Sequence, residues 1–181
     1  MQDSRQTLTG PVPGRLVLVC GLPGAGKTTL ARQLEAAMPA VRLCPDEWLA
    51  DLGVDLWDQA VRDRLERTLW GLAQRLLALG TSVVLEYGFW ARWERDEKRL
   101  DARALGVQVE LHYLEVSLEE RWRRIERRNG DGTWPAAPIT REQLAGWDVL
   151  FEAPDAAELA LFDPPTRLVD GGRARPPRSA I

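Results

Sequence analysis

Short apolar runs alternate with longer segments of helical periodicity along most of the chain. The runs are continuous rather than alternating, which is typical of strands buried on both faces of a sheet. Turn residues and charged segments separate them. Five runs are predicted strands: Arg15 to Cys20, Ala40 to Cys44, Ser82 to Tyr87, Val107 to Val116 and Thr166 to Asp170.

The segments between the runs carry apolar residues at helical spacing, and several have recognisable ends. From Asp58 to Leu79, apolar residues recur every three or four positions, and Gly80 follows as a stop. Ser117 and Glu120 stand in capping-box positions before a charged segment, and Thr140 can cap the helix after it. The other predicted helices run from Lys27 to about Ala37 and from Trp90 to Leu105.

This alternation predicts an α/β fold, a three-layer sandwich with helices on both faces of a mostly parallel five-stranded sheet. No internal repeat, linker or low-complexity block divides the chain. We therefore expect a flexible leader over residues 1–14, a single domain over residues 15–170 and a flexible tail over residues 171–181.

Composition narrows the class of protein. The 181 residues are 45% hydrophobic and 28% charged, as in ordinary globular domains, and the formal net charge of −3 argues against a general polyanion-binding surface. No apolar run approaches the ~20 residues that span a membrane, and the first residues lack a signal-peptide pattern. Cys20 and Cys44 end apolar runs, which favours buried free thiols in a reducing compartment. We expect a cytoplasmic protein.

The segment GLPGAGKTT, directly after the first predicted strand, fits the pattern G-x-x-x-x-G-K-[ST] and opens a predicted helix. In this context, backbone N–H groups and the helix N-terminus can cradle phosphates. Lys27 supplies a point charge toward the β and γ phosphates, and the Thr28 hydroxyl can bind Mg²⁺. The motif therefore predicts a P-loop NTPase fold that binds ATP, with GTP as the alternative, through Gly21, Gly24, Ala25, Gly26, Lys27, Thr28 and Thr29.

The end of the third predicted strand carries further candidate chemistry. Glu86 stands where an acid can reach the metal shell, but aspartate is commoner there, so contact with an acceptor stays an alternative. Aromatic and basic residues follow on the side where ligands bind such sheets. Trp57 could join them, and each tryptophan could equally be core filling. The candidate acceptor residues are Trp48, Glu86, Phe89, Trp90, Arg92, Trp93 and Arg95.

The phosphate loop, Asp46 after the second strand, and the segments SVVLEYGFWARWERD, RRIERRN and WDVLFEAPDAAE follow one another in a fixed order. In this respect the chain, from about Arg15 to Glu158, resembles the small AAA-type P-loop kinases, a group similar to chloramphenicol phosphotransferase, zeta-toxin-type sugar-nucleotide kinases and polynucleotide 5′-hydroxyl kinases. The resemblance implies that Asp46 deprotonates the acceptor hydroxyl. Glu47 is the neighbouring candidate, although alternation would send the two side chains apart, and helix capping is the structural alternative for Asp46.

The same resemblance implies a lid over about residues 117–140 whose arginines close on the phosphates. Arg124 and Arg128 lie four apart on one predicted helical face, and Arg121 could share it. Positive charge of this kind is what a transferring phosphoryl group needs. A solvated, salt-bridged helix is the alternative for some of these arginines. In related kinases, the turn FEAPDAAE lies toward the nucleotide base.

These features predict an ATP- and Mg²⁺-dependent phosphotransferase that moves the γ-phosphate to a hydroxyl of a small molecule. By resemblance, an antibiotic or a nucleoside-like metabolite is a reasonable acceptor. One alternative is a nucleic-acid 5′-hydroxyl kinase, which the acidic balance disfavours. Another is a regulatory NTPase without an acceptor. We expect no membrane partner, and either a monomer or a homodimer.

Overall fold

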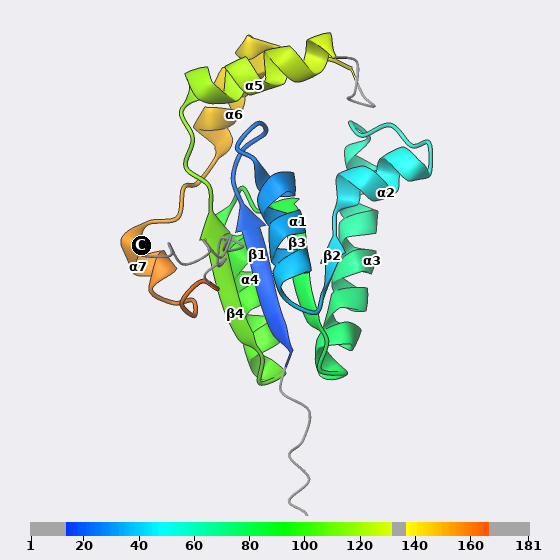
Figure 1. Cartoon of the computed structure of the whole chain (residues 1–181), viewed down its shortest axis with the longest axis vertical. Helices are drawn as coiled ribbons and strands as arrows, with labels where there is room; N and C mark the ends of the chain where they lie inside the picture. The colour runs from blue at the N-terminus through cyan, green and yellow to red at the C-terminus, as the bar shows by residue number, and fades with distance from the viewer. Residues whose placement is uncertain (1–13, 132–136, 167–181) are drawn as a thin grey trace, which may run out of the picture.

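The computed structural model describes residues 14–131 and 137–166, and its centre is a sheet of parallel strands (Figure 1). Within the described residues the sheet has four strands in the order β2-β3-β1-β4, and all three neighbouring pairs are parallel. The strands are β1 (Arg15–Cys20), β2 (Ala40–Leu43), β3 (Ser82–Gly88) and β4 (Gln108–Tyr113). The predicted parallel α/β sheet is confirmed.

Helices cover both faces of the sheet. Helix α1 (Lys27–Ala37) packs on one face, and α3 (Gln59–Ala78) and α4 (Arg92–Ala104) pack on the other (Figure 1). Strand β1 contributes to both cores, since Val17 lies in the core with α1 whereas Leu18 lies in the core with α3 and α4. Both side chains are fully buried, which explains why the strand is apolar at every position after Arg15.

The predicted fifth strand, Thr166 to Asp170, lies outside the described residues apart from Thr166. The chain before it already runs beside β4, where Asp163 forms an isolated parallel bridge with Glu110. Glu110 is fully buried and accepts a hydrogen bond from the Thr166 backbone N–H at 2.8 Å. It also pairs with Arg15 of β1. The described sheet therefore ends at β4, not at a fifth strand.

Three of the remaining helices lie at the carboxyl ends of the strands, and α7 lies beside β4 (Figure 1). Two of them, α5 and α6, pack together through a small core of Ile125, Ile139 and Leu144 and lie across this end of the sheet (Figure 1). Ligand sites of open α/β sheets form at this edge. The helices are α2 (Pro45–Asp51), α5 (Leu118–Gly130), α6 (Arg141–Leu150) and α7 (Ala156–Leu159).

Most predicted helix ends agree with the structure because the capping signals are local. Asp58, Ser117 and Thr140 are N-caps that accept a hydrogen bond from a backbone N–H three residues later. In the part of the chain that the structure describes, no helix combines the length and the apolar character needed to cross a membrane. Apart from Gly14, the predicted leader and tail lie outside the described residues.

Candidate functional site

The loop between β1 and α1 is shaped to bring backbone N–H groups together. Gly24 has φ +81°, and a Cβ there would lie 2.9 Å from the backbone oxygen of Arg121, so α5 lies too close for any side chain at this position. Gly26, at φ 101°, is the N-cap of α1 and places no side chain over the helix end. The N–H groups of the first turn therefore stay available to an anion.

Lys27 folds back over this loop, and its ammonium donates to the carbonyl of Leu22 at 3.2 Å. Burial lowers the pKa of Lys27, while the nearby carboxylates of Asp46 and Glu86 favour its charged form. The lysine is thus a partly desolvated cation between two acids, and an incoming phosphate would add to their stabilising effect.

Glu86, near the end of β3, lies beside the phosphate loop. Its residue is 7% exposed, and its carboxylate accepts hydrogen bonds from the Thr28 hydroxyl and, at 2.7 Å, from Arg42 of β2. Arg42 also pairs with Glu47, so one guanidinium links the third strand to α2. The structure therefore places Glu86 beside the threonine of the phosphate loop.

A cavity of about 930 Å³ extends from this loop between α2, α3, α5 and α6. One part of its wall, here called the phosphate end, consists of the loop, Lys27, Thr28, Thr29, Arg124 and Arg128. Another part, here called the aromatic end, consists of Trp57, Phe89, Trp90, Trp147, Glu66 and Glu94. Asp46, Glu47, Arg62 and Glu86 line the same cavity.

Asp46 lies in the first turn of α2, but it does not cap that helix. The N-cap is Cys44, and Asp46 instead accepts a hydrogen bond from Arg62 of α3 at 2.6 Å. Its charge also reaches two cavity cations: burial lowers the pKa of Lys27 and of Arg128, and Asp46 opposes the shift in both. The structure therefore brings the candidate base to the cations of the phosphate end and gives the capping alternative no support.

Glu47 has different partners from Asp46, although not for the predicted reason. The two acids are helical neighbours rather than residues of an extended segment, so their directions differ by about 100° instead of alternating. Glu47 pairs with Arg32 at 2.9 Å and with Arg42, and these two arginines hold its pKa low after burial has acted in the opposite direction. Glu47 is therefore bound on both sides by cations.

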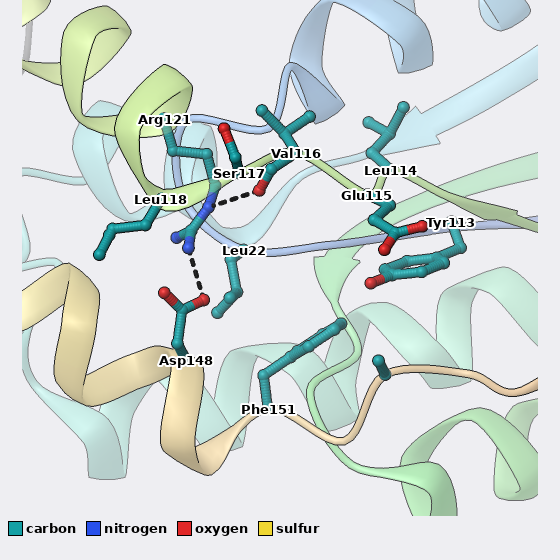
Figure 2. A pocket seen from close by; sticks show the side chains of 11 residues that line it. Leu22, Tyr113, Leu114, Glu115, Val116, Ser117, Leu118, Arg121, Asp148 and Phe151 are labelled. Atoms are coloured by element: carbon teal, nitrogen blue, oxygen red, sulfur yellow. Dashed lines mark hydrogen bonds and ion pairs between the residues drawn. The ribbon is translucent and has the colours of Figure 1, made fainter.

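The three candidate lid arginines have different surroundings. Arg124 donates to the phosphate-loop carbonyls of Gly24 and Ala25 at 3.3 and 3.2 Å. Both Arg124 and Arg128 line the 930 Å³ cavity. Arg121 is 2% exposed, donates to the carbonyl of Val116 at 3.0 Å and pairs with Asp148 of α6 (Figure 2). Arg124 and Arg128 thus face the cavity, whereas Arg121 ties α5 to α6.

A second, smaller cavity of about 380 Å³ lies where β4 ends and α5 begins (Figure 2). Leu22 of the loop lines it, together with Tyr113, Asp148 and Phe151. Phe151 stacks on Tyr113 with ring centroids 5.9 Å apart. Of the turn predicted to lie toward the nucleotide base, Phe151 reaches this cavity and Glu158 does not.

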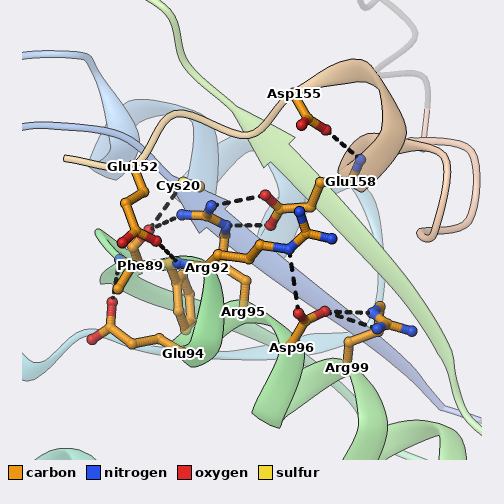
Figure 3. Close-up of polar contacts among 11 residues, drawn as sticks. Cys20, Phe89, Arg92, Glu94, Arg95, Asp96, Arg99, Glu152, Asp155 and Glu158 are labelled. Carbon is orange, nitrogen blue, oxygen red and sulfur yellow. Dashed lines mark hydrogen bonds and ion pairs between the residues drawn. The ribbon is translucent and has the colours of Figure 1, made fainter.

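The prediction that Arg95 contacts the acceptor is wrong, because a ligand cannot reach its side chain. The residue is fully buried, and two of its nitrogens donate to Glu158 at 2.6 and 2.9 Å (Figure 3). A third nitrogen donates to the carbonyl of Phe89 at 2.8 Å. Arg95 and Glu158 form a structural ion pair beneath the turn that follows β3.

That turn aims two aromatic residues at the cavity. Phe89 has φ +51°, in the left-handed region that a bulky residue rarely adopts, and Arg95 holds its carbonyl. A Cβ on Gly88 would lie 3.1 Å from the indole nitrogen of Trp90, so the turn also needs a glycine there. Helix α4 consequently starts at Arg92, two residues later than predicted. Phe89 and Trp90 both line the cavity.

The other predicted acceptor residues do not line the cavity. Trp48 and Trp93 are 43% and 68% exposed, and Arg92 pairs with Asp96 on the surface of α4. Trp147 stacks with Trp57 at a centroid distance of 5.9 Å and meets Trp90 edge-on at 5.8 Å. This tryptophan begins the segment WDVLFEAPDAAE, on which the family resemblance partly rests, but nothing in the sequence placed it among the acceptor residues, because it lies within a predicted helix and any apolar residue satisfies helical periodicity.

Comparisons with known proteins agree with this architecture. A family model described as an AAA domain matches residues 16–154. A structure from Chloroflexus aurantiacus J-10-fl, for which kinase activity has been suggested, is 23% identical, with 79% of this chain and 82% of that chain covered and a TM-score of 0.64. A gluconokinase from Sinorhizobium meliloti 1021 is 21% identical, with coverages of 80% and 78% and a TM-score of 0.55.

A chain of the Pnkp1/Rnl/Hen1 RNA repair complex is 17% identical, with coverages of 88% and 50% and a TM-score of 0.64. No curated protein matches the sequence at a significant level. At these identities the structural likenesses establish the fold, and the family match covers most of the chain.

Proposed function

The chain belongs to the AAA domain family and has the fold of small P-loop kinases, and on that basis we propose that it is an ATP- and Mg²⁺-dependent phosphotransferase acting on a hydroxyl of a small molecule. One observation carries the proposal. Asp46, a carboxylate able to take a proton, lines the same cavity as Lys27 and Thr28 of the phosphate loop. A hydroxyl placed beside Asp46 would thus lie in the space that opens onto the γ-phosphate.

The nucleotide fits across both cavities. Its phosphates would follow the loop into the larger cavity, and its base would enter the smaller one beside Tyr113 and Phe151, whose rings suit stacking. Leu22, in the wall of the smaller cavity, and Pro23, in the wall of the larger one, are neighbouring residues of the loop, so both cavities border the cradle. ATP is proposed as the donor, with GTP as the alternative.

Thr28 and Glu86 fit a Mg²⁺ ion. Their hydroxyl and carboxylate oxygens already touch, and Mg²⁺ in phosphate enzymes is commonly held by one or two protein oxygens together with phosphates and water. When bound, the ion supplies positive charge to the β- and γ-phosphate oxygens. The Thr28 hydroxyl would then have to turn from Glu86 toward the ion.

The protein residues have separate tasks. Asp46 accepts the proton of the attacking hydroxyl, for which its carboxylate must exchange its present partner, Arg62, for the acceptor. Lys27, Arg124 and Arg128 provide positive charge for the phosphoryl oxygens during transfer. Arg124 already contacts the loop that would cradle those oxygens, so only a short movement separates it from the phosphates.

Two alternatives make different predictions about the acceptor. The structural neighbours include a gluconokinase, named for a small sugar acid, and a chain of an RNA repair complex, so the fold itself accommodates both kinds of kinase. The net charge of −3 disfavours a polyanionic acceptor. A regulatory NTPase would need no acceptor space, yet the cavity extends well past the phosphate end.

The deciding experiment follows transfer of ³²P from γ-labelled ATP with Mg²⁺ to a panel of sugars, cyclitols, nucleosides, hydroxylated antibiotics and 5′-hydroxyl oligonucleotides. A labelled small-molecule product that disappears with Lys27→Ala would support the proposal. Label on the oligonucleotide alone would favour the nucleic-acid kinase. Release of inorganic phosphate at one rate whatever the panel member would favour the regulatory NTPase and contradict the proposal.

A further inference from the structure

Helix α6 contributes to both cavities with adjacent residues. Trp147 lines the larger cavity, whereas Asp148 and Phe151 line the smaller one. The Arg121–Asp148 pair and the core of Ile125, Ile139 and Leu144 hold α6 against α5. The position of Trp147 is therefore set by the same contacts that shape the proposed base site.

Trp147 completes an aromatic cluster with Trp57 and Trp90, which come from three separate parts of the chain. Trp57 precedes α3, Trp90 follows β3, and Trp147 belongs to α6. The ring contacts, 5.9 Å for the first pair and 5.8 Å for the second, are the distances of ordinary aromatic packing. The cluster joins the lid to the body of the protein at the aromatic end of the cavity.

Core filling does not account for this cluster. Trp57 is 43% exposed although it stacks on another ring, and all three tryptophans border the cavity, Trp147 from the edge of the small core of Ile125, Ile139 and Leu144. Leu56, the residue before Trp57, is buried, and its carbonyl accepts a hydrogen bond from Arg62, the partner of Asp46. One short path of contacts thus links the exposed ring to the candidate base.

We propose that the acceptor carries a ring that packs against Trp57, Trp90 and Trp147, and that Trp147 is a residue determining acceptor specificity. Flat ring faces, whether aromatic or the C–H face of a sugar or cyclitol, bury well against indole. An open-chain polyol offers no such face and loses more conformational freedom on binding. This inference rests on the proposed function, because it assigns the cluster to the acceptor of that reaction.

The test compares ring and open-chain alcohols of matched size by quenching of tryptophan fluorescence, with ADP and Mg²⁺ present to order the lid. The pairs are myo-inositol with sorbitol and 1-phenyl-1,2-ethanediol with 1,2-octanediol. We expect the ring member to bind about tenfold more tightly in at least one pair. Equal or tighter binding of the open-chain member in every pair, or no binding of any ring compound at millimolar concentration, would overturn the inference.

Two tryptophan variants then locate the effect. Trp147→Leu keeps an apolar side chain but removes the ring, and it should weaken binding of the preferred ring compound about tenfold while leaving its open-chain match unchanged. Trp93→Leu is the matched control, because Trp93 is 68% exposed on α4 and lies outside the cavity wall, and it should change neither. An equal loss in both variants, or none with Trp147→Leu, would contradict the assignment. Thermal unfolding of both variants verifies that each is folded.

The same measurements separate this inference from the proposed function. Fluorescence reports binding without any phosphoryl transfer. A ring preference that depends on Trp147, with no transfer from ATP to any compound, would keep the cluster as a ring-binding site and remove the kinase. Faster transfer to open-chain acceptors would keep the kinase and remove the inference.

Discussion

Two arginine–carboxylate pairs with the same shortest distance, 2.6 Å, lie in opposite environments. In the pair Arg95–Glu158, both side chains are at most 2% exposed, and two parallel hydrogen bonds join them. In the pair Arg62–Asp46, the side chains are 21% and 44% exposed, and one hydrogen bond joins them at the wall of the cavity.

The two pairs differ in whether water or a ligand can replace one of the partners. The buried pair has no water to replace a lost partner, so either charge alone would be strongly unfavourable and the pair stays closed. The cavity pair borders open space, so a ligand can replace Arg62 at Asp46 at small cost. The first pair therefore supports the turn at Phe89, and the second can take part in chemistry. Four predictions test this contrast, beginning with the largest expected effect.

Asp46→Asn should lower the rate of phosphoryl transfer about 10²- to 10⁴-fold, because the amide cannot accept the proton of the acceptor. The free energy of unfolding should change by less than about 1 kcal/mol, since the Arg62 pair is solvent-accessible. Steady-state kinetics and urea unfolding measure the two quantities. Asp51→Asn, an exposed residue of the same helix, is the control and should behave as the parent protein. Unchanged transfer in Asp46→Asn would exclude this residue as the base.

Glu158→Ala should destabilise the protein by about 3–5 kcal/mol, because it leaves the guanidinium of Arg95 buried without a counter-charge. Urea unfolding measures the loss. The double variant Arg95→Met/Glu158→Leu should recover part of it, since two apolar side chains need no counter-charge. A small loss in Glu158→Ala would mean that water reaches Arg95, and the contrast between the pairs would fail.

The third prediction concerns Glu66, the more distant of the two carboxylates beside Arg62. The Nη1 atom of Arg62 lies 3.5 Å from the Glu66 carboxylate, whereas its Nη2 atom donates a hydrogen bond of 2.6 Å to Asp46. Burial raises the pKa of Glu66 to about 7 in the folded protein, with Arg62 acting in the opposite direction. Between pH 4.5 and 7 the folded state then binds more protons than the unfolded state, so stability falls as pH rises through this window. Glu66→Gln should remove that fall, a gain of about 3 kcal/mol at pH 8.

Urea unfolding at several pH values between 4 and 8 measures the effect. Glu97→Gln, on the exposed side of α4, is the control and should keep the pH dependence of the parent protein. A Glu66→Gln variant with the same pH dependence as the parent protein would show that this carboxyl titrates normally.

Arg62→Met should change the free energy of unfolding by less than about 1 kcal/mol, the smallest of the four effects, because Asp46 can turn to water when its partner is removed. Arg95→Met makes the same chemical change in the buried pair and should cost several times more. Chemical denaturation of the two variants side by side provides the comparison. Similar losses would show that the cavity pair is as structural as the buried one.

Sequence reasoning was most successful where function depends on the backbone of one short segment. The loop from Gly21 to Thr29 carries its glycines, lysine and threonine in fixed order, and its neighbouring strand and helix are local patterns too. The caps at Asp58, Ser117 and Thr140 were predictable for the same reason. The acceptor residues come from loops and helices far apart in the chain, and their assignment was less accurate.

The contrast between Trp147 and Arg95 shows why. Both lie in predicted helices, and periodicity identifies the segment but not which face meets a cavity. Arg95 follows the aromatic turn in sequence, yet its helix rotates it inward to Glu158, which lies 63 residues away. Trp147 lies 57 residues after Trp90, yet the packing of α6 brings the two rings into contact. Nothing local encodes either distance.

By itself, the amino-acid sequence determined the parallel α/β fold, the phosphate loop and the carboxylate after the second strand, because these depend on hydrophobic periodicity and on neighbours a few residues apart. Only the tertiary structure decided which charges face the cavity. A guanidinium or carboxylate costs little where water reaches it and much where it does not, and the burial that separates Arg62–Asp46 from Arg95–Glu158 arises only when distant segments pack together.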